Sequence, residues 1–210
     1  MYELGCFLKE WQTLIGAFIG GIFSLLVALI VAYKVRSHDE IAAAYILLID
    51  LRSFVVQAET LEKTSKEQGS SPEESSLMAI AGLLSFPPTL SPLFEESVMR
   101  VSPVDKYLTA HLALFKKIFS EIEFLLKRLS KYNDIFESTG KVPIPIERLR
   151  GDIKNVGVFL RYTVEHAKCC ENLLDKLIIC RTAIFHRLFR YIRRPKSENE
   201  CMKLLKEGKV

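Results

Sequence analysis

The sequence has none of the short motifs that mark the common catalytic and nucleotide-binding sites. It has no Gly-x-x-x-x-Gly-Lys phosphate loop, no Gly-x-Ser-x-Gly nucleophile turn and no His-Glu-x-x-His metalloprotease helix. Acidic residues are scattered along the chain, and no Glu-x-x-His pair of the di-iron kind occurs. We therefore expect a protein that is not an enzyme, with no catalytic residue, no cofactor-binding residue and no resident metal or other cofactor.

Cysteine is scarce, and its spacing does not suit a disulfide framework. The chain has 5 cysteines, an odd number, without a Cys-x-x-Cys pair. Two of them are adjacent in sequence, which favours a reducing compartment over a disulfide-forming one. The cysteines are Cys6, Cys169, Cys170, Cys180 and Cys201.

Long uncharged runs are also scarce, with one exception near the N-terminus. Residues 11–33 (WQTLIGAFIGGIFSLLVALIVAY) contain no charged side chain, and a helix of this length covers about 34 Å, enough to cross a bilayer core. Trp11 and Tyr33 mark its ends, where aromatic rings favour the headgroup level. The next uncharged run, 41–49, is too short to cross. We predict one transmembrane helix at 11–33, preceded by a short leader at 1–10.

A cleaved signal peptide would need a shorter apolar run and a nearby cleavage site, and a lipidated Cys6 would have to follow the run instead of preceding it.

The residues that flank this run indicate how it is oriented. Lys34 and Arg36 follow the run directly, whereas the leader has little net charge. By the positive-inside rule, the N-terminus lies outside and residues 34–210 lie in the cytoplasm. The opposite orientation, with a domain facing the periplasm, differs by only a few flanking charges.

Small side chains recur at every fourth position of the predicted transmembrane helix. Such a face lets two helix backbones approach closely in lipid, and the Gly-x-x-x-Gly spacing is the best-known example. We interpret it as the seam of a homodimer, against the alternative that small residues are simply common in spanning helices. This small-residue face consists of Gly16, Gly20, Ser24, Ala28 and Ala32.

The rest of the chain is predicted to be all-α, a helical bundle built on a long antiparallel helix hairpin. A juxtamembrane helix is expected within 34–67, because 38–67 lacks proline and glycine. Short helices and a Ser/Pro-rich connector follow at 68–102, with a helix start at Ser71-Pro72. The hairpin occupies 103–194 and a polar basic tail occupies 195–210. No stretch has the alternation expected of a strand.

Two long amphipathic segments form the predicted hairpin. Apolar residues recur three and four positions apart from Pro103 to about Ser138, as in a coiled coil or bundle seam, and Gly140 ends that helix. A second helix is expected from about Ile146 to Arg194, after a proline-containing turn. A short turn between two such helices favours antiparallel packing.

Histidine and cysteine side chains are the main candidates for site chemistry. His166, Cys169 and Cys170 occupy one face of the second hairpin helix, but zinc sites normally need four ligands from at least two chain segments. We favour the interpretation that they are core residues, because Cys170 lies on the apolar face. His111 lies on the seam of the first hairpin helix, where a pH-sensitive contact is the less favoured alternative to a simple core role.

Basic residues are concentrated at the C-terminal end. The net charge is +4, and Lys and Arg clearly outnumber Glu within 181–210. Apolar residues and arginines alternate there at helical spacing, which suits contact with an anionic membrane surface, although a bundle core with a solvated arginine face is the favoured alternative. Nucleic-acid binding is not expected, because no accompanying motif is present. The candidate surface residues are Arg187, Arg190, Arg193 and Arg194.

The N-terminal quarter resembles a group of uncharacterised bacterial single-pass membrane proteins. The resemblance rests on the Trp-Gln-Thr-Leu-Ile-Gly opening at Trp11, the basic stop at Lys34 and the alanine-rich segment that follows, and it covers about residues 11–52. It implies a bacterial inner-membrane location and assigns no functional residue.

We therefore expect a single-pass inner-membrane protein whose cytoplasmic helical bundle acts through protein–protein contacts or self-association. Its expected partners are the lipid bilayer, a second copy bound through the transmembrane helix, and a protein partner of unknown identity. One alternative is a periplasm-facing envelope or phage-lysis component. Another is a sensor or enzyme with a pocket inside the bundle, for which the seams offer only His111, Thr163 and Arg181 as polar candidates.

Overall fold

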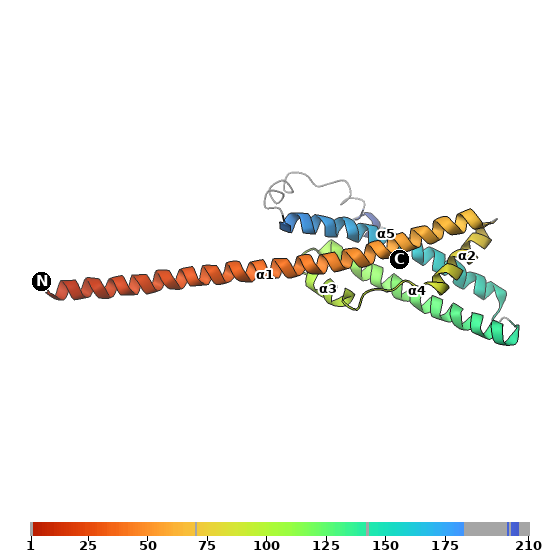
Figure 1. The fold of residues 1–210 in the computed structure, drawn as a ribbon, viewed down its shortest axis with the longest axis horizontal. Coiled ribbons are helices and arrows are strands. Elements are labelled where there is room, and N and C mark those ends of the chain that lie inside the picture. The colour runs from red at the N-terminus through yellow and green to blue at the C-terminus, as the bar shows by residue number, and fades with distance from the viewer. Residues whose placement is uncertain (1, 70, 142, 183–200, 202, 206–210) are drawn as a thin grey trace. The chain divides into compact units, whose positions relative to one another are not determined.

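The computed structural model describes residues 2–69, 71–141, 143–182, 201 and 203–205, and this part of the chain is all-α, as the sequence predicts. Five helices, α1 to α5, are present within the described ranges, which contain no strand (Figure 1). The chain divides into two compact units, Met1–Glu40 and Ile41–Val210.

Helix α1 (Tyr2–Gln68) is continuous from the predicted leader through the predicted juxtamembrane helix. The Ser37-His38-Asp39-Glu40 segment, which has the spacing of a helix start, lies inside the helix and does not interrupt it. From residue 14 to residue 36, every side chain of the first unit is exposed. The segment that begins at Leu14 is long and apolar enough to cross a membrane, by length and composition.

The second unit is organised around the hairpin of α4 (Lys106–Thr139) and α5 (Ile146–Thr182). Helix α4 begins three residues later than expected, because Asp105 is its N-cap, whereas Ser102-Pro103 has the sequence of a cap and first helical residue but does not start the helix. Oδ1 of Asp105 accepts hydrogen bonds from the backbone N–H groups of Tyr107 (2.8 Å) and Leu108 (3.2 Å). The helix ends as predicted at Gly140, whose φ of 64° is a left-handed conformation that glycine adopts without steric cost. The expected continuation of α5 to Arg194 lies outside the described residues.

Two short helices connect α1 to the hairpin. Helix α2 (Pro72–Ser85) begins where the sequence predicts, and the side chain of Ser71 caps it by accepting a hydrogen bond from the backbone N–H of Glu74. Helix α3 (Phe94–Val101) lies within the expected connector. The connector is held to α1 at two points, by Asp50 to the backbone N–H of Ser91 (3.2 Å) and by Gln57 to the carbonyl of Phe86 (2.6 Å).

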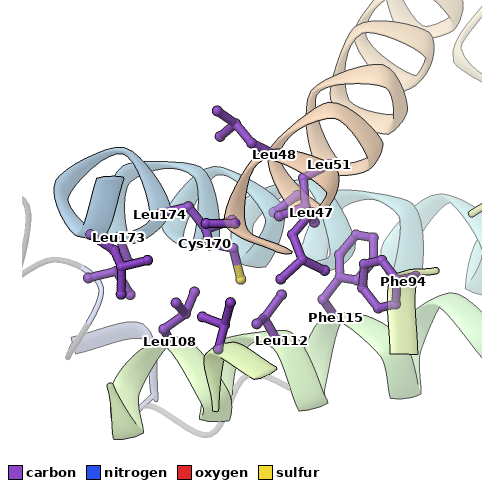
Figure 2. Close-up of a cluster of buried hydrophobic side chains, with 14 of the residues drawn as sticks. Leu47, Leu48, Leu51, Phe94, Leu108, Leu112, Phe115, Cys170, Leu173 and Leu174 are labelled. Carbon is purple, nitrogen blue, oxygen red and sulfur yellow. The ribbon is translucent and has the colours of Figure 1, made fainter. Parts of the chain in front are cut away.

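Apolar side chains of the second unit form two clusters along the hairpin. The larger cluster joins α1, α3, α4 and α5 and contains the fully buried Leu47, Phe115 and Leu174, which are labelled in Figure 2. The smaller cluster joins α2, α4 and α5 around Ile122. Burial of such side chains contributes about 1.5 to 3 kcal/mol each, which makes these clusters the main stabilising feature of the bundle.

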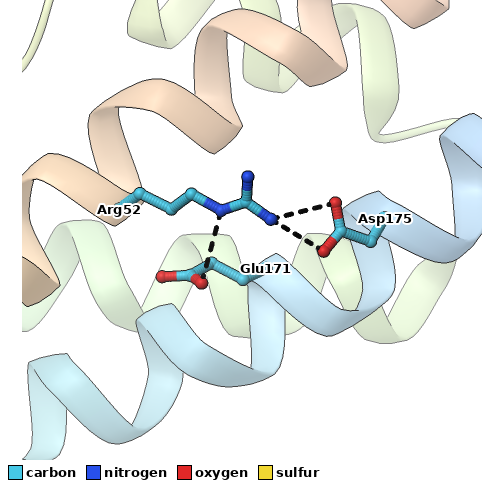
Figure 3. A network of polar contacts seen from close by, with 3 residues as sticks. All are labelled: Arg52, Glu171 and Asp175. Atoms are coloured by element: carbon cyan, nitrogen blue, oxygen red, sulfur yellow. Dashed lines mark hydrogen bonds and ion pairs between the residues drawn. The ribbon is translucent and has the colours of Figure 1, made fainter.

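Ion pairs join the same helices at the edges of the clusters. Arg52 of α1 contacts Asp175 (2.9 Å) and Glu171 (3.7 Å) of α5 (Figure 3). Because these groups are partly exposed, the pairs orient the helices more than they stabilise them. Arg128 of α4 pairs with Asp152 of α5, and only 8% of the Asp152 side chain is exposed. This carboxylate would be left buried without its charge partner if Arg128 were removed.

We predict that Asp105→Ala lowers the stability of the bundle by about 1 kcal/mol, because two backbone N–H groups at the start of α4 lose their acceptor. Asp105→Asn is the matched control, since the amide oxygen still accepts these bonds. Thermal denaturation of the full chain in detergent, followed by circular dichroism, measures both variants. Equal melting temperatures for the alanine and asparagine variants would contradict the assigned cap.

We also predict that Arg128→Met destabilises the bundle by about 3 kcal/mol, because the Asp152 carboxylate remains buried and unpaired. The double variant Arg128→Met with Asp152→Leu should recover most of this loss, since no buried charge remains. A double-mutant cycle tests this: the melting temperatures of Arg128→Met, Asp152→Leu and the double variant are compared with that of the unaltered chain. Additive losses would show that the two side chains do not interact.

Candidate metal centre

Histidine and cysteine side chains from three chain segments meet inside the second unit. Helix α4 supplies His111, and α5 supplies His166 and Cys169, three residues apart on one face. Cys201 comes from the C-terminal segment, in which Cys201 and residues 203–205 have helical backbone. Residues more than fifty positions apart therefore form one cluster, which we call the His/Cys cluster.

The donor atoms of this cluster are close together. One ring nitrogen of His111 and the sulfur atoms of Cys169 and Cys201 all lie within 4.8 Å of one another. The Nδ1 atoms of His111 and His166 are 2.9 Å apart. Three donors therefore lie close together, and His166 adds a fourth through its contact with His111.

Both imidazole rings are buried and incompletely hydrogen-bonded. His111 is 0% exposed and His166 is 1% exposed. Their close Nδ1 atoms require that one ring donates its proton to the other. Among the described residues, no partner lies in hydrogen-bonding geometry with Nε2 of either ring. Buried polar atoms are normally paired, so these nitrogen atoms need a physical explanation.

Burial keeps both histidines neutral at ordinary pH. Desolvation and the neighbouring His111 ring lower the pKa of His166 to about 4. Desolvation also lowers the pKa of His111, although the Cys201 backbone and the charge of Asp105 act in the opposite direction. A neutral imidazole has a lone pair available for a ligand.

The two thiols interact with each other. A hydrogen bond with Cys201 and burial raise the pKa of the Cys169 thiol well above its usual value. Neither Cys169 nor Cys201 forms a disulfide bond. As a protonated thiol Cys169 is a weak nucleophile, because the thiolate is the reactive species and the raised pKa keeps the proton on the sulfur.

The sequence paired His166 and Cys169 with Cys170, whereas the structure separates that set. Cys170 is 0% exposed and belongs to the larger apolar cluster, so its predicted core role is confirmed (Figure 2). His166 and Cys169 instead meet His111 and Cys201. The seam position of His111 was a usable signal for burial, but nothing in the sequence indicated that Cys201 returns to the hairpin.

The other candidate residues lie elsewhere or are not described. Gly16 and Gly20, with Ser24 and Ala28, belong to the first unit, and a Cβ atom built at either glycine meets no other group within 4 Å. Thr163 is buried, and its hydroxyl donates a hydrogen bond to the carbonyl of Phe159 (2.7 Å) in its own helix. The candidate membrane-surface residues lie outside the described part of the chain; they are Arg187, Arg190, Arg193 and Arg194.

Comparison with known proteins gives no further assignment. No protein-family model, curated protein or solved structure matches this chain. The chemistry of the His/Cys cluster therefore has to be derived from its own residues.

Proposed function

We propose that this chain is a single-pass membrane protein whose N-terminal helix anchors a helical bundle, and that the bundle acts through contacts with proteins, including a second copy of itself. The observation that carries the proposal is the long apolar stretch of α1, whose side chains are exposed on all sides. We do not propose a catalytic role for the chain.

Large apolar side chains on this stretch favour lipid as their surroundings. Leu14, Phe18 and Phe23 are 65%, 70% and 64% exposed. Burying such a side chain contributes about 1.5 to 3 kcal/mol, so leaving many of them in water is costly. Continuous apolar exposure of this extent marks a membrane or protein contact. A helix also satisfies its own backbone hydrogen bonds, as a bilayer core requires.

The flanking charges support a cytoplasmic bundle. Lys34 and Arg36 come directly after the apolar run, and such charges favour the cytoplasmic side. The resemblance of residues 11–52 to bacterial membrane proteins supports the bacterial inner membrane as the location. A bundle on the other side of the membrane is the outcome that the topology experiment below distinguishes.

The second unit has exposed apolar side chains that suit contact with a protein. Tyr45, Ile49 and Val56 are spaced along one side of α1 and are 48%, 67% and 62% exposed. They alternate with residues of the same helix, such as Leu47 and Leu51, that are fully buried in the bundle. This arrangement gives α1 an inner apolar side for the core and an outer one for a partner.

A catalytic pocket has less support than a contact surface. Of the polar residues on the seams, His111 is sealed from solvent and Thr163 is hydrogen-bonded to its own helix. A substrate would have no access to these side chains without a rearrangement of the bundle. We therefore propose that the bundle works as an interaction domain.

The topology can be tested by fusing alkaline phosphatase or green fluorescent protein after Val210 in a bacterial host. We predict fluorescence without phosphatase activity, with the fusion remaining in the membrane fraction after carbonate washing. Phosphatase activity without fluorescence would contradict the cytoplasmic bundle but not the anchor. Release of the fluorescent fusion by carbonate would contradict the anchor itself.

Self-association through the small-residue face can be tested with Gly20→Ile. We predict that this variant weakens dimerisation in lipid, because a bulky side chain separates two helices that meet at glycine. Gly21→Ile is the matched control, since Gly21 lies beside the face. A Cβ atom at either glycine meets nothing within 4 Å outside the adjacent turns of its own helix, so neither position is packed against another part of the chain. Energy transfer between labelled chains in liposomes measures association, and equal effects of the two variants would contradict the proposed seam.

A further inference from the structure

We propose that His111, His166, Cys169 and Cys201 bind one divalent transition-metal ion, and that this ion is zinc. The proposal concerns the interior of the second unit and does not rest on the membrane anchor. Two imidazole nitrogens and two thiolates form the donor set of many structural zinc sites. The ligands come from α4, α5 and the C-terminal segment, so the ion would join three parts of the chain that are distant in sequence.

The distances within the His/Cys cluster are close to those that zinc requires. With Zn–N bonds of about 2.0 Å and Zn–S bonds of about 2.3 Å, tetrahedral ligands lie about 3.3 to 3.8 Å apart. The three donors of His111, Cys169 and Cys201 are within 4.8 Å of one another. The two Nδ1 atoms, 2.9 Å apart, would need to separate by only a few tenths of an ångström.

The protonation states are also favourable for the imidazole ligands. Both rings are buried, and each neutral imidazole offers one ring-nitrogen lone pair to a metal ion once the ring that donates its Nδ1 proton carries that proton on Nε2 instead. The thiols must release their protons, and two protons should therefore leave the protein for each ion that binds. Two thiolates balance the charge of a divalent cation, and the buried site becomes electrically neutral.

A disulfide between Cys169 and Cys201 would explain less of the geometry. It would use the two sulfur atoms but give no role to the two buried histidines, 0% and 1% exposed, whose Nδ1 atoms lie 2.9 Å apart. It would also require an oxidant. A metal ion engages all four side chains at once, and sulfur with nitrogen donors in tetrahedral geometry selects zinc over magnesium or calcium.

The experiment uses the full chain purified in detergent with a reductant. We expect elemental analysis to find one zinc ion per chain. After removal of zinc with a chelator, Co²⁺ should restore one equivalent of binding, with the intense visible bands of tetrahedral Co²⁺ and a sulfur-to-cobalt charge-transfer band. Proton release during the titration should be two per ion. The zinc-bound form should melt at a higher temperature than the chelator-treated form.

Variants identify the ligands. Loss of a group that only orients a ligand weakens metal binding by about 10- to 100-fold, so His111→Ala, Cys169→Ser or Cys201→Ser should weaken it by at least about 100-fold. Each serine variant should also lose about half of the charge-transfer intensity, because one of two thiolates is missing. His38→Ala and Cys180→Ser are the matched controls, since these residues lie outside the cluster, and both should bind Co²⁺ as the unaltered chain does.

Three results would overturn the proposal. The first is a folded, reduced chain that gives no tetrahedral Co²⁺ spectrum. The second is Co²⁺ binding that the ligand variants and the control variants affect equally. The third is a Cys169–Cys201 disulfide, detected by mass spectrometry, in protein purified with a reductant. The first and third results are measured on the unaltered chain. The proposal can therefore be tested even if a variant misfolds.

Discussion

The exposed apolar side chains of α1 are the constraint on which our account of this protein depends. Residues 14–36 are exposed throughout, and the run from Leu14 to Tyr33 is almost wholly apolar. Water is an unfavourable surrounding for such a surface, at about 25 cal/mol for each square ångström of apolar area. Lipid removes this cost, and the helix needs no other partner for its backbone. On this proposal the bundle always works beside a membrane, and its contacts are limited to molecules that reach that surface.

In the second unit, the α4–α5 hairpin is the element against which the other parts pack. Both apolar clusters, the Arg128–Asp152 pair and the histidines of the His/Cys cluster lie between these two helices. Helix α1 adds to the hairpin through Leu47 and through the contacts of Arg52 with α5. Apolar burial supplies the stability, whereas the buried polar groups fix which helix faces meet. A zinc ion at the His/Cys cluster would add a further link, between the hairpin and the C-terminal segment.

Local patterns in the sequence were sufficient to predict the elements, because caps and periodicity are local properties. Ser71-Pro72 gave the start of α2, Gly140 gave the end of α4, and the seam correctly predicted that His111 is buried. The start of α4 was placed too early, because Ser102-Pro103 resembles a cap as closely as Asp105 does. The His/Cys cluster could not be predicted. Its residues come from segments that are 32 or more positions apart in sequence, and only packing brings Cys201 to α4 and α5.

The most direct test of the membrane anchor uses Trp11, the only tryptophan of the chain. The unaltered protein is placed in liposomes that contain lipids brominated at a series of depths, and quenching of the tryptophan fluorescence is measured. Our account predicts that Trp11 lies at the headgroup level, so that lipids brominated nearest the headgroup quench most strongly and lipids brominated near the bilayer centre quench least. Fluorescence that no brominated lipid quenches would contradict the anchor, because Trp11 would then remain in water.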